Sequence, residues 1–337
     1  MSRWRTIALA LAALAVAGGC GGSSGSSDDT GGGGTSAAPK VKVGLVTDIG
    51  GLNDRSFNFL ANKGLQDAVQ QLGVEGRVLE SKSDADYIPN LEQLVTQKYD
   101  LTISVGFLMG DQTKQVAEAF PDAKMAIIDF AYDPPVPNID GLVFKEQEAG
   151  YLAGYLAGKM TKSGTVSTVG GQKIPPVDHY IAGFQQGAKD ANPSIKLLNG
   201  YSQDFVAQAK CKEIALEQIA QGSDVVFQVA GQCGLGALDA AKEKSVWGIG
   251  VDADQAYLGD HILTSALKRV DVAVFNTIKS VVDGTFQGGQ VIVFGLAEDG
   301  VGIGEVHSSV PQDVLDEVEA QKQKIIDGSL AVNDTVP

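Results

Sequence analysis

The sequence predicts an α/β protein built from two parallel sheets, each covered by helices. From residue 41 onward, short apolar runs of strand length alternate with stretches of helical period. Strands separated by helices of about 10–15 residues form βαβ units, and such units build parallel sheets. Ten apolar runs precede residue 270, which is too many for one compact doubly wound sheet. Two sheets of roughly 120–140 residues each fit the chain better.

The first five predicted strands are assigned to one sheet and the next five to the other. The first set spans residues 41–47, 77–81, 101–106, 125–129 and 141–144, with helices at 54–72, 88–97 and 111–120. The second set spans residues 165–170, 195–200, 225–230, 246–251 and 262–266, with helices at 147–160, 178–191, 205–221 and 235–244. The tail is expected to hold helices at 270–282 and 312–326, and two short strands near Val291 and Val301.

Each predicted sheet defines a lobe, and the boundary falls after Phe144, where the second βαβ series opens. The tail is too small to fold alone, so the chain must return to the first lobe near residues 268–270. We therefore expect one lobe to hold residues 40–144 and about 270–295, and the other to hold residues 145–268 and about 296–337.

The first nineteen residues have the features of a secretory signal. Arg3 and Arg5 precede an apolar run at 7–17, which is too short for a membrane span. The run ends in AGGC, small residues before a cysteine as in the lipobox of bacterial lipoproteins, so we expect cleavage before Cys20 and its lipidation. An ordinary signal peptide with an incidental cysteine is the alternative.

Residues 20–39 are mostly Gly, Ser, Thr and Asp, a composition typical of a flexible tether. A tether is useful only if its far end is held, which favours the lipid anchor. Two or more acyl chains on Cys20 would hold it stably, whereas a single chain would not.

The chain is strongly acidic. Cleavage of the signal would remove two arginines and leave 24 basic against 41 acidic side chains, a formal net charge of −17. This charge argues against nucleic acid as a partner, because binding phosphates requires patches of Lys and Arg. It suits a secreted protein that must stay soluble.

The spacing of Gly150, Gly154 and Gly158 imitates the contact face of a membrane helix pair. Charged residues bound this segment closely on both sides. We therefore predict a soluble helix that packs tightly on a sheet.

Apart from Cys20, the chain has two cysteines, Cys211 and Cys233. In an oxidising compartment an even pair predicts a disulfide, with two buried thiols as the alternative. Cys211 is expected early in a helix and Cys233 in the loop after a strand, both beside one cleft. A bridge over this loop would contribute roughly 3 kcal/mol. The three histidines are scattered and neither cysteine has a partner at ligand spacing, so we expect no metal site and no cofactor.

Carboxylates end three predicted strands, at the edge where open α/β sheets bind ligands. Asp48 ends the first strand, Asp129 ends the strand MAIID, and Asp252 ends the strand VWGIGVD. Asp48 could instead cap the turn or the next helix, and Asp129 could cap the following loop. Asp54 fits the cap role better than Asp48, because it lies just before a helical run, and this leaves Asp48 for a ligand.

Two aromatic residues open predicted helices in opposite lobes. Phe57, followed by Asn58, lies at the first helix start, and Phe205 follows a strand of the second lobe. One aromatic from each lobe would clamp a flat ring, and each stacked contact adds roughly 0.5–1.5 kcal/mol beyond area burial. The alternative is that both rings belong to the core. Together with the Asp48 carboxylate and the Asn58 amide, the clamp could hold a small polar ring.

Gly231 and Lys268 complete the candidate site. Gly231 begins the turn GQCGLG, which lacks the spacing of a phosphate loop, so its expected use is close backbone approach to a neutral ligand. Asp252 can accept both hydrogens of a vicinal diol. Lys268, which ends the strand ILTSALK, would neutralise it and donate to a hydroxyl. The alternative is a plain surface salt bridge, which contributes little.

Several ordered motifs resemble the basic membrane protein family of bacterial lipoproteins, also called the purine nucleoside receptor family. The resemblance covers residues 40–332, and many ordered matches make it specific. The matching segments are VGLVTDIGGLNDRSFN at 43–58, VGF at 105–107, IID at 127–129, EAGYLAGYLAG at 148–158, VAGQCGLG at 229–236, GVDADQ at 250–255 and TSALK at 264–268.

This resemblance implies a fold of the type I periplasmic-binding class, with two Rossmann-like lobes and three hinge crossings. It implies a substrate-binding protein of an ABC transporter, lipid-anchored on the extracytoplasmic face of the cell membrane, with a permease as partner. It also implies a nucleoside in the cleft, with purines favoured, although the residues themselves do not separate purines from pyrimidines. Gln232 and Cys233 depart from the small residues that many members have in this loop.

The resemblance also implies a role for each candidate residue. Phe57 and Phe205 would sandwich the base, while Asn58 and Asp129 would bond its edge. These roles are completed by four further residues: Asp48 close to the base, Asp252 and Lys268 on the ribose hydroxyls, and Gly231 through its backbone.

Two other functions compete with a nucleoside receptor. One is a receptor for a sugar or another small polar ligand, since sugar sites also use aromatic stacking and carboxylates. The other is a calcium-dependent nucleoside hydrolase. Such enzymes open with an Asp-rich loop, and the segment TDIGGLND of this chain is superficially similar to that loop. However, the place two residues before Asp48 holds Val46, and only Asp54 supplies a second carboxylate nearby. A hard cation takes 6–8 oxygen ligands. Neither cysteine has a nearby His, and no candidate catalytic triad is evident in the sequence, so we expect no enzyme.

Overall fold

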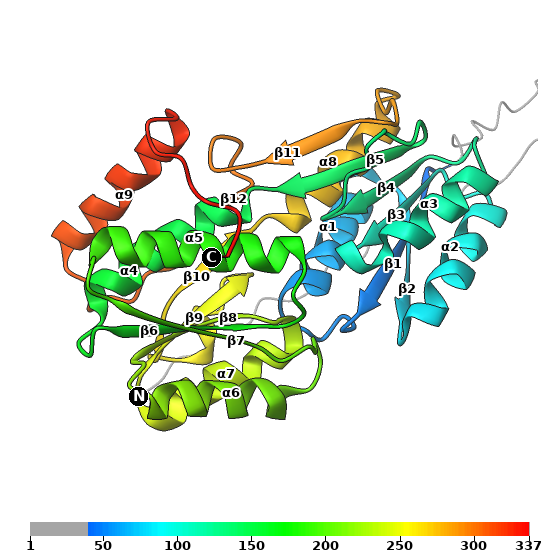
Figure 1. The fold of residues 1–337 in the computed structure, drawn as a ribbon. Coiled ribbons are helices and arrows are strands. Elements are labelled where there is room, and N and C mark those ends of the chain that lie inside the picture. The colour runs from blue at the N-terminus through cyan, green and yellow to red at the C-terminus, as the bar shows by residue number, and fades with distance from the viewer. Residues whose placement is uncertain (1–39, 337) are drawn as a thin grey trace, which may run out of the picture. The chain divides into compact units, whose positions relative to one another are not determined.

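The computed structural model describes residues 40–336 (Figure 1). The predicted signal, the lipidation site Cys20 and the tether lie outside these residues. Within 40–336, no helix combines the length and the apolar character that a membrane span requires.

The first sheet has six strands, all paired in parallel, in the order β11-β5-β4-β3-β1-β2. Its strands are β1 (Lys42–Ile49), β2 (Glu75–Ser81), β3 (Leu101–Val105), β4 (Met125–Ile128), β5 (Ile139–Phe144) and β11 (Val291–Phe294). The helices packed on it are α1 (Phe57–Leu72), α2 (Tyr87–Thr96), α3 (Gly110–Ala119) and α8 (Val270–Val282). Together they form the first lobe.

The second sheet also has six strands, in the order β12-β10-β9-β8-β6-β7. Its strands are β6 (Thr165–Gly170), β7 (Lys196–Tyr201), β8 (Val225–Val229), β9 (Trp247–Asp252), β10 (Ile262–Lys268) and β12 (Val301–Ile303). Only β12 runs antiparallel to its neighbour, β10. The second lobe adds α4 (Glu146–Met160), α5 (Pro175–Ala191), α6 (Gln208–Ala220), α7 (Gly231–Lys244) and α9 (Gln312–Ile326). The prediction of two mostly parallel sheets with helices is confirmed.

The chain passes between the sheets three times. It leaves the first sheet between β5 and α4, returns between β10 and α8, and leaves again between β11 and β12. The crossings lie close together at one side of the space between the sheets (Figure 1). Residues from both lobes meet next to them.

Side-chain alternation along β1 explains how helices cover both faces of the first sheet. Val43 and Leu45 pack into the core cluster shared with α1 and α8, whereas Val46 packs with residues of α2 and α3. Neighbouring strand positions point to opposite faces. Because helices cover both faces of the sheet, its strands consist of consecutive apolar residues, which is the pattern that the sequence shows.

Close helix packing in the second lobe depends on glycines of α4 and α5. A Cβ at Gly154 would lie 2.0 Å from the carbonyl oxygen of Phe184, and one at Gly187 would lie 2.1 Å from that of Tyr151. The backbones therefore touch. The tight packing predicted for this segment occurs, but its closest partner is a second helix rather than a sheet.

Four predicted helix starts were wrong by three or more residues. The helix predicted at 178 begins at Pro175. The helix predicted at residue 54 begins at Phe57, because the Asp54 carboxylate caps it from outside. The helix predicted at 205 begins at Gln208, so Phe205 lies in the preceding loop. The helix predicted at 235 begins at Gly231. Cys233 therefore lies in the first turn of this helix rather than in a loop. The glycines of GQCGLG suggested a turn, but in the structure they belong to the helix, where Gly236 allows close contact with the backbone of Gln208.

Candidate functional site

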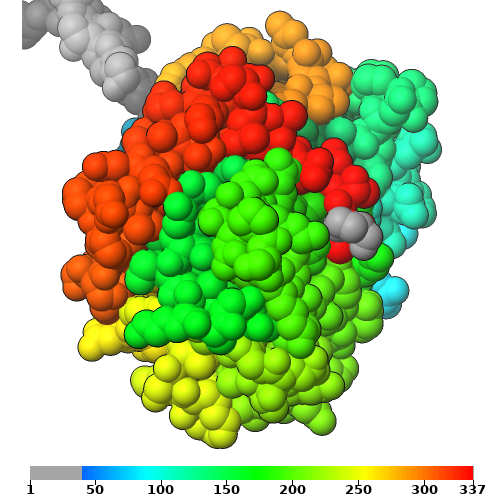
Figure 2. Space-filling view, turned by 60° about the vertical axis from the view of Figure 1, so that its left-hand side comes forward, coloured from blue at the N-terminus to red at the C-terminus, as the bar shows by residue number. Residues whose placement is uncertain are grey.

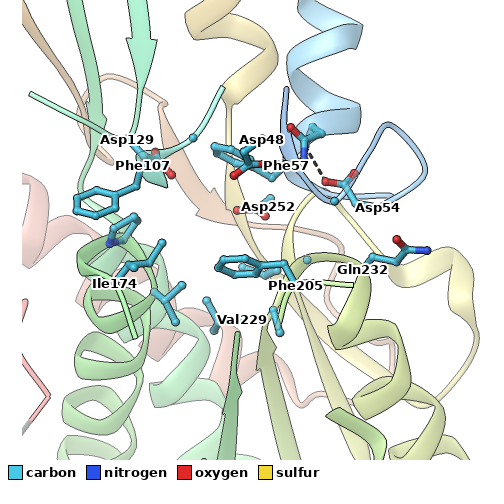
Figure 3. A pocket seen from close by; sticks show the side chains of 18 of the residues that line it. Asp48, Asp54, Phe57, Phe107, Asp129, Ile174, Phe205, Val229, Gln232 and Asp252 are labelled. Carbon is cyan, nitrogen blue, oxygen red and sulfur yellow. Dashed lines mark hydrogen bonds between the residues drawn. The ribbon is translucent and has the colours of Figure 1, made fainter. Parts of the chain in front are cut away.

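A pocket lies between the two lobes, at the carboxyl ends of the strands (Figure 3). It encloses about 610 Å³ of space unfilled by atoms, part of it open to solvent. All eight predicted ligand-binding residues line it: Asp48, Phe57, Asn58, Asp129, Phe205, Gly231, Asp252 and Lys268. The sequence-based set is therefore brought together in one place.

Asp48 and Asn58 form one wall of the pocket. Asp48 ends β1, and its Oδ1 accepts a hydrogen bond of 3.0 Å from Nδ2 of Asn58. Burial raises the pKa of Asp48 to about 8. The other amide atom of Asn58, Oδ1, is buried and has no hydrogen-bond partner within residues 40–336. Leaving a buried acceptor unpaired costs free energy, and an N–H or O–H group of a ligand could pair with this atom.

Gly106 makes room for the Asp48 carboxylate. Its φ is +119°, and a Cβ there would lie 2.4 Å from Asp48 Oδ2. A side chain at this position would push the carboxylate out of the pocket wall. The VGF motif at 105–107 therefore supports the site through its glycine as well as through Phe107, which lines the pocket.

Asp54 has a structural role at the start of α1. Its Oδ1 accepts the backbone amides of Ser56 and Phe59, and its Oδ2 accepts that of Asn58 at 2.7 Å. Burial raises the pKa of Asp54 to about 6, although these hydrogen bonds lower it. This carboxylate holds the N-terminus of the helix that presents Phe57 and Asn58.

Asp252 lies between the lobes at the end of β9. Its Oδ2 accepts a hydrogen bond of 2.5 Å from Oγ of Ser56 in the first lobe, and its Oδ1 accepts one of 3.4 Å from the Tyr180 hydroxyl. Burial raises the pKa of Asp252, although the ammonium of Lys268 lowers it. Sequence reasoning missed Ser56 and Tyr180, because each reaches Asp252 only through the tertiary fold.

Lys268 is only 2% exposed and lies in a buried cluster of charges. Its Nζ is 2.6 Å from Asp129 Oδ1 and 2.8 Å from Glu146 Oε1. The direct partners of Lys268 are Asp129 and Glu146 rather than Asp252, and because the lysine is buried this is no surface salt bridge. Burial would lower the pKa of Lys268, but the surrounding carboxylates raise it above its usual value. Burial raises the pKa of Asp129 to about 7 even with Lys268 beside it.

Glu146 is a member of this cluster that sequence reasoning missed. Burial alone would raise its pKa, but Lys268 and His179 together lower it. Nδ1 of His179 lies 3.0 Å from Glu146 Oε2. A carboxylate at the start of an otherwise apolar helix was the available signal, since such a residue is rarely buried without a partner.

Aromatic rings reach the pocket from both lobes. Figure 3 shows Phe57 on the side of the first lobe and Phe205 on the side of the second, with Asp252 between them. Nζ of Lys268 lies 5.2 Å from the centre of the Phe57 ring, a cation–π distance. Phe107 adds a third ring and packs on Phe130, with 5.2 Å between centres.

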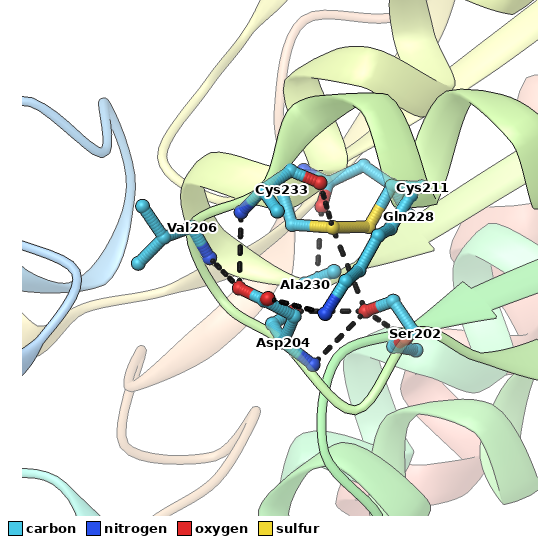
Figure 4. Close-up of a disulfide and its surroundings, with 10 residues drawn as sticks. Ser202, Asp204, Val206, Cys211, Gln228, Ala230 and Cys233 are labelled. Atoms are coloured by element: carbon cyan, nitrogen blue, oxygen red, sulfur yellow. Dashed lines mark hydrogen bonds and ion pairs between the residues drawn. A yellow bond between two sulfur atoms is a disulfide. The ribbon is translucent and has the colours of Figure 1, made fainter.

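A disulfide lies next to the pocket and links Cys211 to Cys233, with Cα atoms 5.6 Å apart (Figure 4). Cys233 follows Gly231 and Gln232, both of which line the pocket. Gly231 has a φ of +53°, in the left-handed region that glycine adopts readily.

The described residues offer no metal site. Within residues 40–336, no group of three or more His, Cys, Asp or Glu side chains is arranged to hold an ion. The oxygens of Asp54 are already occupied by backbone amides. Asp48 and Asp54 therefore do not act together as ligands of a hard cation.

Comparison with known proteins identifies the family. The family described as ABC transporter substrate-binding protein PnrA-like (Bmp) matches residues 40–336. A Listeria innocua protein named CD4+ T-cell-stimulating antigen is 37% identical, and the alignment covers 97% of this chain and 98% of that protein. An uncharacterised lipoprotein of Pyrococcus abyssi is 36% identical over 86% of this chain and 79% of its own length.

A further relative, the ABC transporter nucleoside-binding protein BmpA of Lactococcus lactis, is 33% identical, with 96% of this chain and 97% of that protein covered. Among solved structures, an ABC transporter solute-binding protein of Aeropyrum pernix superposes with a TM-score of 0.81 at 29% identity, covering 88% of this chain and 94% of that one. The periplasmic-binding-protein fold implied by the sequence is confirmed. The chain belongs to the Bmp family of PnrA-like substrate-binding proteins of ABC transporters.

Proposed function

We propose that this protein binds nucleosides, with a preference for purine nucleosides, in the cleft between its lobes and delivers them to an ABC permease. The observation that carries the proposal is the composition of one pocket. An aromatic ring from each lobe, Phe57 and Phe205, borders the same space as two strand-end carboxylates with buried side chains, Asp129 and Asp252. A nucleoside has a flat base for the rings and a diol for a carboxylate.

Each part of the ligand has a matching group. The base lies between Phe57 and Phe205, where each stacked ring adds about 0.5–1.5 kcal/mol. Asn58 and Asp129 bond the base edge, with Asp48 beside them. Asn58 Oδ1 is buried without a partner and accepts from a base N–H.

The ribose hydroxyls go to Asp252 and Lys268. A carboxylate accepts both hydrogens of a vicinal diol through charge-assisted bonds, and the buried ammonium of Lys268 donates to a hydroxyl oxygen. The backbone at Gly231 closes the pocket on the side of the second lobe. That the relative from Lactococcus lactis is named a nucleoside-binding protein supports the same ligand class.

Binding is coupled to movement of the lobes. The three crossings form a hinge, and closure on the ligand buries it between the rings. The free protein exchanges between open and closed forms, and the nucleoside stabilises the closed one because only that form contacts it from both sides. The closed form is the one that the permease recognises.

We further propose that the protein is anchored at the extracytoplasmic face of the membrane by lipid on Cys20. The sequence AGGC at 17–20 and the Gly/Ser-rich tether support this, as does the name of the lipoprotein relative. Metabolic labelling with a palmitate analogue should mark the wild type. It should leave the Cys20→Ser variant unlabelled and released from membranes.

A sugar receptor remains the second candidate, because Asp252 and Lys268 would also suit free ribose. A calcium-dependent hydrolase is disfavoured, because Asp54 is committed to capping α1. The family is one of substrate-binding proteins, and we propose that the chain catalyses no reaction.

Calorimetric titration of residues 40–337, stripped of ligand by unfolding and refolding, tests the proposal. The panel is adenosine, guanosine, inosine, uridine, cytidine and ribose. One-to-one binding of a purine nucleoside with ribose silent is expected. Ribose binding as tight as inosine would favour the sugar receptor, and silence across the panel would refute the ligand class. Absence of free base after incubation with inosine and calcium would support a receptor without catalysis.

A further inference from the structure

We propose that the disulfide between Cys211 and Cys233 is a positioning element of the binding site. It holds the loop at 202–207 so that the Phe205 ring faces the cleft, and nucleoside affinity depends on it. The inference rests on the proposed function, because the loop matters for affinity only if Phe205 stacks on the ligand. Neither cysteine lines the pocket itself.

The disulfide joins the first turns of two neighbouring helices. Cys211 lies in the first turn of α6 and Cys233 in that of α7, and both are fully buried. Beside the bridge the helix backbones touch, since a Cβ at Gly236 would lie 1.9 Å from the carbonyl oxygen of Gln208. The bridge therefore ties the point where the loop enters α6 to the segment that borders the pocket.

The middle of the loop is attached to Cys233. The Cys233 amide donates a hydrogen bond of 2.9 Å to the carbonyl oxygen of Phe205. Within residues 40–336 this is the only hydrogen bond of the Phe205 backbone. The amide belongs to the first turn of α7, where backbone N–H groups have no partner inside the helix. The position of Phe205 thus follows that of Cys233.

The exit of the loop touches the bridge directly. Oδ1 of Asp204 accepts the amides of Val206 and Ala207 at 2.8 and 3.0 Å and turns the chain toward α6 (Figure 4). Sγ of Cys233 lies 3.1 Å from the carbonyl oxygen of Ala207. The bridged sulfur has no hydrogen to donate, so this is a packing contact. Both the backbone and the sulfur of Cys233 therefore hold the loop.

Hydrogen bonds at the start of the loop fix the loop backbone against β6 but do not fix the direction of the Phe205 ring. The amides of Ser202 and Gln203 donate to carbonyl oxygens at the end of β6, at 2.9 and 3.0 Å. The ring of Phe205 then lies over Gly171, where a Cβ would be 2.3 Å away. On the Gly171 side the ring meets backbone alone, and elsewhere it packs against the buried core. The Cys233 attachment fixes the backbone from which the ring projects into the cleft.

Loss of the bridge should reduce the fraction of molecules whose Phe205 ring is in place. Apparent affinity falls in proportion to that fraction. A loop that holds its ring in place only one tenth of the time would bind about tenfold more weakly. A bound ligand would still select the native loop, so binding is weakened rather than abolished.

A double-mutant cycle tests the proposal by calorimetry with inosine. It compares the wild type, Cys211→Ala/Cys233→Ala, Phe205→Ala, and the combination of all three changes. We expect the cysteine pair to weaken binding about tenfold in the wild type, and by less than about twofold once Phe205 is Ala, because residues that act together are not additive. The matched cycle with Phe57→Ala, on the opposite lobe, should be additive.

Additive effects with Phe205 would overturn the proposal, because the bridge would then act only through overall stability. An unchanged affinity of the cysteine pair would also overturn it. Failure of the oxidised wild type to bind any nucleoside refutes the proposed function instead. In that case, amide hydrogen exchange still decides the positioning role. In the variant without the bridge, faster exchange confined to the amide of residue 233, which donates to Phe205, supports the positioning role. An exchange rate equal to that of the wild type refutes it.

If the alanine pair does not fold, Cys211→Val/Cys233→Ala refills the space between the helices without restoring the bond. The same cycle is then run with this pair. Equal affinity of this variant and the wild type would show that packing alone holds the loop and would overturn the proposal.

Discussion

Lys268 and Asp129 come from different sheets, yet Nζ of the lysine lies 2.6 Å from Oδ1 of the aspartate. Lys268 ends β10 of the second lobe, and Asp129 follows β4 of the first. Glu146 binds the same ammonium at the start of α4. The ion cluster therefore connects the lobes beside two of the crossings, so it lies at the proposed hinge as well as at the pocket.

Replacing Lys268 by Ala should destabilise the protein strongly. The change would leave two buried carboxylates without their cation, and breaking a buried pair costs about 3–5 kcal/mol. Urea unfolding gives the free energy directly. Lys114→Ala is the control, because its pair with Glu118 is exposed and should contribute less than about 1 kcal/mol. Similar small losses for both variants would contradict the buried cluster.

Ser56→Ala should weaken nucleoside binding by opening the contact between lobes. The Ser56 hydroxyl donates to Asp252 Oδ2 at 2.5 Å, and the substitution removes this donor from the carboxylate. A lost bond to a charged group costs about 1.5–3 kcal/mol, or roughly 10- to 150-fold in affinity by titration. Ser194→Ala, at an exposed serine, should bind as the wild type does. Equal affinities of the two variants would argue against this contact.

The free energy of unfolding should fall as the pH rises, because Asp48 loses its proton when the chain unfolds. Burial raises the pKa of its carboxyl to about 8 in the folded chain from 3.8. Between about pH 4 and pH 8 the folded chain keeps a proton that the unfolded chain has lost, so the free energy of unfolding decreases across this window.

Asp48→Asn removes this titration and should reduce the dependence, while the contributions of Asp54 and Asp129, whose pKa values are also raised, remain. The measurement is urea unfolding at about pH 5 and about pH 8. Asp313→Asn, at an exposed position of α9, should keep the pH dependence of the wild type. The role of Asp48 would be ruled out if Asp48→Asn lost as much stability as the wild type between the two pH values.

Nucleosides that lack a hydrogen-bond donor on the base should bind poorly. Inosine carries an N–H at N1, whereas the ring edge of purine riboside carries only acceptors. Purine riboside would leave Asn58 Oδ1 unpaired, which costs about 1–3 kcal/mol, or roughly 5- to 150-fold in affinity. Asn58→Ala should remove most of this difference in paired titrations. If purine riboside bound the wild type as well as inosine does, Asn58 would not read the base edge.

Much of the fold could be predicted because its signals are local. A strand covered on both faces is an apolar run, and the carboxylates Asp48, Asp129 and Asp252 stand out as the polar residues that end such runs. Their meeting in one pocket follows from parallel sheets, whose carboxyl ends share an edge.

The missed contacts depend on how distant segments meet. Ser56 and Asp252 are 196 residues apart in the chain, and Lys268 and Glu146 are 122 apart. No local pattern marks such partners. The wrong start at Phe205 has a similar cause, since the turn before α6 is set by Asp204 and by a cysteine on another helix.

The glycine contacts between α4 and α5 have a genetic consequence. Every amino acid that a missense mutation can place at Gly154 or Gly187 brings a Cβ, and there it collides with backbone of the facing helix. Neither residue lines the pocket. A screen for strains unable to use external nucleosides should therefore recover mutations at these codons, well away from any residue that touches the ligand.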